Sequence, residues 1–77
     1  MNTENLTYTY RLKEFRQKMG IRQEDLAEAL GVMSKTVSAW ETGRSLPRVI
    51  DAVRIAQFFD AMVEDMVTVR RASDGKA

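Results

Sequence analysis

The sequence contains no cysteine and no histidine. Without cysteine the chain can form neither a disulfide nor a thiolate metal site, which suits a protein of a reducing compartment. Without histidine it lacks the commonest general base and the commonest metal ligand. The sequence also has no glycine-rich phosphate loop and no cluster of metal-ligand residues. We therefore expect a protein that is not an enzyme and that needs no metal or cofactor.

Long apolar runs are missing as well, because charged residues interrupt each candidate between positions 49 and 67. No segment approaches the roughly 20 apolar residues that a membrane-spanning helix needs. Residues 1–10 are polar and lack the apolar centre of a signal peptide. We expect a cytoplasmic protein that makes no membrane contact.

An excess of charge of one sign is also absent, since twelve Lys and Arg against eleven Asp and Glu give a net charge of +1. This value is low for a nucleic-acid-binding protein, so any affinity for DNA must depend on where the charges lie. Most basic residues fall between positions 11 and 54, whereas Asp60, Glu64 and Asp65 cluster late in the chain. That asymmetry favours one electropositive face.

The 77 residues are enough for one small core and no more. Apolar spacing, with glycine as a stop signal, predicts helices over residues 10–19, 23–30, 34–42, 48–59 and 63–70. The expected fold is all-α, a compact domain of five helices over residues 10–70. Residues 1–9 are expected to be a flexible arm and residues 71–77 a disordered tail.

The C-terminal third carries more apolar residues than a chain of this size can easily cover. Over residues 48–59 the spacing predicts a buried stripe, formed by Val49, Ala52, Val53, Ala56 and Phe59. Phe58 is adjacent to Phe59, so it is expected to point outward. These apolar residues could fill the core or form a homodimer interface, and we expect the interface. Its expected residues are Phe58, Val63, Val67 and Val69.

Residues 23–41 form the most informative segment, two short amphipathic helices that meet at Gly31. Leu26 and Leu30 face inward from the first helix, and Val37 and Trp40 from the second. Glycine at the turn allows a positive φ, which other residues adopt at a cost. Two helices held at a steep angle are the arrangement that places a helix in the major groove of DNA.

Residues 12–67 resemble the helix-turn-helix family of the lambdoid phage repressors and Cro proteins, the Cro/C1 type. The matching positions are Leu12, Pro47, Phe59 and residues 15–16, 20–21, 23–27, 30–32, 37–38, 40–44, 55–56 and 64–66. The resemblance implies a lambda-repressor-like domain of five helices. It also implies binding to operator DNA, usually as a two-fold dimer.

The resemblance implies roles for single residues. The residues expected to read base edges are Ser34, Lys35, Ser38 and Ala39. The residues expected to contact DNA phosphates are Arg22, Gln23, Thr42, Arg44 and Arg48. Arg16 and Glu41 match an ion pair that ties the first helix to the end of the third.

Some positions depart from the family pattern. Where a serine or threonine usually caps the second and third helices, this chain has Arg22 and Met33, which cannot accept the amide hydrogen bond. Ser34 could cap the third helix one residue late. Ala39 offers a methyl group that suits contact with a thymine methyl. Direct reading of bases therefore depends mostly on Lys35, for which a plain solvated lysine is the alternative.

We expect a transcription regulator, a repressor that binds an inverted-repeat operator in double-stranded DNA as a homodimer. The alternative is an antitoxin or another protein-interaction module of a toxin–antitoxin pair. The protein partner would then be the toxin, whereas a regulator could also meet the polymerase.

Overall fold

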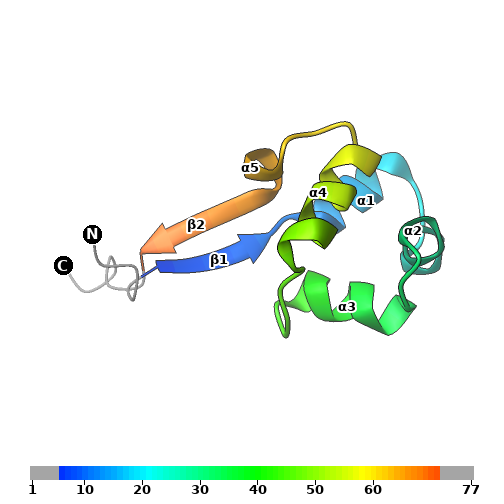
Figure 1. Cartoon of the computed structure of the whole chain (residues 1–77), viewed down its shortest axis with the longest axis horizontal. Coiled ribbons are helices and arrows are strands. Elements are labelled where there is room, and N and C mark those ends of the chain that lie inside the picture. Colours follow the sequence, from blue (N-terminus) through cyan, green and yellow to red (C-terminus); the bar gives the residue numbers. More distant parts are fainter. Residues whose placement is uncertain (1–5, 72–77) are drawn as a thin grey trace.

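The structure, a computed structural model, describes residues 6–71. A helical body carries a two-stranded ribbon that extends away from it (Figure 1). The elements follow in the order β1 (Leu6–Tyr10), α1 (Leu12–Met19), α2 (Gln23–Leu30), α3 (Ser34–Thr42), α4 (Val49–Phe58), α5 (Val63–Met66) and β2 (Val67–Arg71). The five expected helices are present, so the predicted fold class is confirmed.

The core lies where α1, α2, α3, α4 and α5 meet. The expected core residues Leu26, Leu30, Val37 and Trp40 are buried, with exposed fractions of 5% or less. Leu12 from α1, Ile55 from α4 and Met66 from α5 join them in one cluster. Burying one large aliphatic side chain stabilises a fold by roughly 1.5–3 kcal/mol. Each helix is therefore held by its apolar contacts to the others.

Gly31 makes the turn between α2 and α3 with a φ of +72°. Its N–H donates to the Ala27 and Glu28 carbonyls at the end of α2, and the Val32 N–H also donates to the Ala27 carbonyl, at 3.0 Å. Arg54 of α4 donates to a third carbonyl there, that of Leu30, at 2.5 Å. The turn and α4 together fix the direction in which α3 leaves α2.

The buried face of α4 differs from the expected stripe. Val49 is 82% exposed and Val53 is 37% exposed, whereas Ala52, Ile55 and Ala56 are buried. In this apolar segment, spacings of three and four residues fit two neighbouring faces of the helix. The apolar pattern alone does not show which of the two faces is buried. Packing on the core selects the face that contains Ile55, so the first turn of α4 keeps its valine in solvent.

The two-stranded ribbon was not predicted from the sequence. β1 pairs antiparallel with β2, with Tyr8 opposite Val69 and Tyr10 opposite Val67. Residues 6–9 are thus strand, not flexible arm, and α5 ends at Met66, not at residue 70. Alternating threonine with tyrosine or valine favours a strand, but its partner lies about 60 residues away. Residue 71, assigned to the tail, also belongs to β2, while residues 1–5 and 72–77 lie outside the described chain.

Phe58 does not point outward as expected. It is half-buried, packs against the core, and lies edge-on to the Phe59 ring, with centroids 4.9 Å apart and planes at 88°. The argument from adjacent helical positions fails because α4 ends at Phe58 and Phe59 is its C-cap. Val63 is half-buried against the same core. Two of the four expected dimer-interface residues therefore pack largely within their own chain.

Replacing Gly31 tests the positive φ of the turn. An added Cβ would meet only the Arg54 guanidinium, at 3.9 Å, which is an ordinary contact, so the cost is backbone strain alone. We expect Gly31→Ala to lower the free energy of unfolding by about 1–2 kcal/mol. Gly31→Asn should lose less, because asparagine enters the left-handed region more readily. Denaturant unfolding measures both variants, and equal stability of the alanine variant and the parent would contradict this account.

Candidate nucleic-acid interface

The outward surface of α3 carries the residues expected to read bases. Ser34 and Lys35 are exposed in its first turn, and Ser38 and Ala39 are half-buried one turn later. Positions four apart share a helix face, so Ser34 with Ser38 and Lys35 with Ala39 form two adjacent rows. Val37 and Trp40 are buried on the opposite side. The structure gives α3 no side-chain cap, so Ser34 does not act as one.

The chain after α3 folds back against this surface. Gly43 has a φ of +81°, and the Arg44 and Ser45 amides then donate to the Ala39 carbonyl at 3.0 and 3.3 Å. The result is an open depression lined by Lys35, Thr36, Ala39, Arg44 and Ser45. It brings together a base-reading and a phosphate-contacting candidate, Lys35 and Arg44, so two positive charges border one hollow.

Thr36 and Ser45 line the depression although sequence reasoning did not single them out. Thr36 lies three residues before Ala39, so its helical position alone places it on the same face. Ser45 follows Arg44 in the loop, and only the fold-back onto the Ala39 carbonyl brings it to the surface of α3. The first of these two could have been found from spacing, and the second could not.

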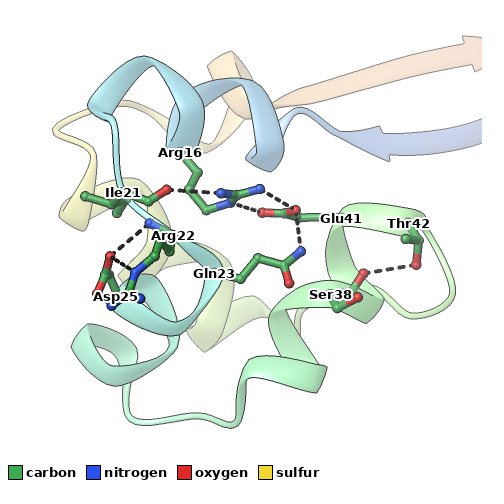
Figure 2. A network of polar contacts seen from close by, with 8 residues as sticks. All are labelled: Arg16, Ile21, Arg22, Gln23, Asp25, Ser38, Glu41 and Thr42. Carbon is green, nitrogen blue, oxygen red and sulfur yellow. Dashed lines mark hydrogen bonds and ion pairs between the residues drawn. The ribbon is translucent and has the colours of Figure 1, made fainter.

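Glu41 near the end of α3 is the centre of a buried polar network (Figure 2). Arg16 donates from Nε to Oε2 at 2.6 Å and from Nη2 to Oε1 at 3.1 Å, forming the two-pronged pair expected from the resemblance. Gln23 donates from Nε2 to Oε1 at 2.9 Å, a contact that the sequence did not indicate. Arg16 also donates to the Ile21 carbonyl at 3.0 Å. The network joins α1, the loop before α2, the start of α2 and α3.

The network keeps both charged groups ionised. Burial raises the pKa of Glu41, but hydrogen bonds from Arg16 and Gln23 outweigh it and leave that pKa below its ordinary value. The hydrogen bond to Glu41 raises the pKa of Arg16. Their side chains are only 3% and 11% exposed, so solvent screens the attraction weakly.

The side chains of Gln23 and Thr42, both expected to contact phosphates, already donate hydrogen bonds within the chain. Gln23 gives one amide hydrogen to Glu41, so its side chain is held in place with the second hydrogen left to donate. The Thr42 hydroxyl donates to the Ser38 and Ala39 carbonyls at 3.0 and 3.3 Å. Its only proton is therefore already used. The expected phosphate contact through Thr42 does not fit this geometry.

Two other phosphate candidates are exposed arginines with acidic neighbours. Arg22 pairs with Asp25 at 3.2 Å, and hydrogen bonds from Arg22 hold the pKa of Asp25 below its ordinary value. The Arg22 backbone amide also donates to Asp25, at 2.9 Å, which satisfies one amide at the start of α2. Arg48 precedes α4 and lies 3.5 Å from Asp51. Both guanidinium groups could reach DNA only in competition with these carboxylates.

Residues 6–71 contain no group of three acidic side chains arranged to hold a metal ion. None of the described helices combines the length and apolar character needed to cross a membrane.

Comparison with known proteins places this arrangement among helix-turn-helix proteins. A helix-turn-helix family model matches residues 12–61. An uncharacterised HTH-type transcriptional regulator of Archaeoglobus fulgidus is 41% identical over 56 residues, 73% of this chain and 80% of the relative. The uncharacterised HTH-type transcriptional regulator YgzD of Bacillus subtilis is 38% identical over 56 residues, which are 73% of this chain and 85% of YgzD.

Two further matches are more distant. The HTH-type transcriptional activator BcrR of Enterococcus faecalis is 27% identical over 63 residues, 82% of this chain but 31% of BcrR. A crystal structure of a Bacteroides fragilis protein superposes with a TM-score of 0.75 at 21% identity, covering 80% of this chain and all of that one. That likeness shows a shared fold.

The pKa of Glu41 predicts a dependence of stability on pH. Because the folded-state pKa is lowered, the contribution of Glu41 is present above its ordinary value near 4.5 and is lost as the pH falls below it. At neutral pH we expect Glu41→Gln to lower the free energy of unfolding by about 1.5–3 kcal/mol. Denaturant unfolding between pH 7 and pH 3 should show a shallower loss of stability in the variant than in the parent.

The matched control is Glu28→Gln, which alters an exposed acid on α2. Its pH dependence should follow that of the parent. Parallel curves for the parent and Glu41→Gln would show that the ionisation of Glu41 contributes nothing to the pH dependence of stability.

Proposed function

The chain belongs to the helix-turn-helix family of DNA-binding transcription regulators, and we propose that it represses transcription by binding an inverted-repeat operator as a homodimer. The observation that carries this proposal is the surface of α3 and the following loop, where Lys35 and Arg44 border one open depression. The residues on the inward side of α3 are buried in the core, so this outward surface is the part available to a duplex.

In this proposal α3 enters the major groove with Lys35 and Ser34 in its leading turn. The Lys35 ammonium donates to O6 or N7 of a guanine, the acceptors that this base presents in the groove. The methyl group of Ala39 packs against a thymine methyl, and the Ser38 hydroxyl lies beside them. Sequence preference then depends on one charged contact and on short side chains that permit a close approach.

Phosphate contacts flank α3 on both sides. Arg44 lies at the edge of the depression, beyond the end of α3. On the other side α2 begins without a side-chain cap, and Gln23 in its first turn retains a second amide hydrogen to donate. Amides at a helix start attract a phosphate. Arg22 and Arg48 would add weaker contacts, because each is already paired with an aspartate.

Repression by occlusion requires only that a dimer cover the promoter. Activation requires a further contact with polymerase, as well as the right position on the DNA. We therefore infer repression. Selecting bound sequences from a random pool of DNA tests for an inverted repeat directly.

A second candidate is a DNA-binding antitoxin, favoured by apolar side chains that no described residue covers. Leu46, Val49 and Ile50, in the loop before α4 and its first turn, are 52%, 82% and 59% exposed. Exposed apolar side chains close together in the sequence would suit a protein partner. Co-expression with a small neighbouring reading frame would discriminate, since a toxin should be neutralised only by chains that keep these residues.

Lys35→Ala tests base reading. Loss of a contact to one guanine should cost about 1–3 kcal/mol at a single base pair and leave the rest of the preferred sequence unchanged. Quantitative binding to a set of single-base operator variants measures this. An equal loss of affinity for every DNA sequence would assign Lys35 to a phosphate instead.

Arg44→Ala tests a phosphate contact. It should weaken binding to all sequences alike and lower the slope of log affinity against log salt by about 1 per site. Lys18→Ala, an exposed lysine near the end of α1, is the charge-matched control and should leave that slope unchanged. Our assignment fails if the two variants show the same salt dependence, or if Arg44→Ala changes the preferred sequence.

A further inference from the structure

The two faces of the ribbon differ in chemistry. Antiparallel partners and residues two apart share a face, so Tyr8 and Tyr10 of β1 lie on the same side as Val67 and Val69 of β2. Thr9 and its partner Thr68 lie on the other side. We call the four apolar residues Tyr8, Tyr10, Val67 and Val69 the ribbon face.

The inner half of the ribbon face is joined to the core. The Arg11 amide donates to the Met66 carbonyl at 2.8 Å, closing the base of the ribbon. Tyr10 packs against the core and lines a small, partly open cavity with residues of α1, α4 and α5. Tyr10 and Val67 are half-buried, so their apolar surface continues that of the core.

The outer half of the ribbon face has no cover among residues 6–71. Tyr8 is 50% exposed and its partner Val69 is 52% exposed. The ribbon extends clear of the helices at this point (Figure 1). A two-stranded sheet is marginally stable by itself in water, and a third layer or further strands usually support it. A well-formed ribbon with an apolar outer half therefore indicates a missing partner.

We propose that the partner is a second copy of this chain, with the two ribbon faces packed against each other in antiparallel orientation. A two-fold axis then passes near Tyr8 and Val69, the middle residues of β1 and β2. The inference rests on the proposed function, since it names the interface of the operator-binding dimer. Of the four residues expected at the dimer interface, Val67 and Val69 remain in this proposal. Phe58 and Val63 pack within their own chain, and Tyr8 and Tyr10 take their place.

The charge at the ribbon base favours the antiparallel orientation of the second copy. The exposed acids Glu64 and Asp65 lie on α5, which directly precedes β2 at the base of the ribbon. Antiparallel ribbons place the outer end of one copy beside the base of the other, so that the acidic bases of the two copies lie apart. A parallel arrangement would bring like charges together.

The spacing of the two bodies agrees with this arrangement. A five-residue strand is about 17 Å long, and the molecule is 22 Å across its shorter axes. Ribbons that overlap along their whole length would separate the two α3 helices by about 40 Å, near the ~34 Å of one DNA turn. Contact at the tips alone would add a further ~17 Å and miss that spacing. In Figure 1, α3 lies along one edge of the body, so the two-fold presents both copies of α3 on the same side.

A single cysteine at the proposed two-fold tests the arrangement, because the chain has no other. Val69→Cys should form a disulfide-linked dimer under mild oxidation that still binds the full operator. The matched control is Val49→Cys, whose position is more exposed, 82% against 52%, but lies on α4. It should link only at the rate of random collision. Equal linkage of both variants would overturn the proposal.

A second measurement covers the case in which the two sulfurs do not meet the narrow geometry of a disulfide. The double variant Tyr8→Thr with Val69→Thr keeps residues that favour strands but removes the apolar contact. By sedimentation, its dimerisation constant should weaken by roughly tenfold or more relative to the parent. Val49→Thr should associate like the parent. A parent that stays monomeric above the concentrations at which it binds the operator would contradict the inference.

DNA binding separates the two proposals. The double variant should keep its affinity for a single half-site and lose the added affinity for the complete inverted repeat. If the parent dimerises through Val69 but binds no half-site, the proposed function fails and the interface stands. If the parent binds half-sites without dimerising, the interface fails and DNA binding stands.

Discussion

The carboxylate of Glu41 is the contact on which the orientation of α3 depends. It is almost completely buried and accepts hydrogen bonds from Arg16 and Gln23, while Arg16 holds the Ile21 carbonyl. A buried charge without partners would cost several kcal/mol, so these donors are required once Glu41 occupies the end of α3. Apolar packing brings the helices together, and the network fixes how α3 lies against α1 and α2.

The same network decides which charges remain for DNA. Arg16 forms an ion pair with Glu41, and Arg22 and Arg48 form ion pairs with aspartates. Lys35 and Arg44 lie together on the outward surface. A chain with a net charge of only +1 thus presents a local positive site, because no acidic residue lines the depression that Lys35 and Arg44 border. Placement of charge, more than its sum, supports the proposed binding.

Local signals in the sequence predicted the helical body well, because each helix has its own apolar spacing and three helices end at a glycine with positive φ. The Arg16–Glu41 pair followed from the family resemblance. The ribbon was missed because β1 is defined by pairing with a strand at the other end of the chain. The buried face of α4, the Gln23 contact and Ser45 depend on tertiary packing, which periodicity does not encode.

Chemical-shift mapping of the backbone amides during titration with operator DNA tests the central claim most directly. The account predicts large shifts in residues 34–39 and 44–45, and at Gln23 in the first turn of α2. Shifts confined to the ribbon or to the start of α4, with α3 unchanged, would contradict it.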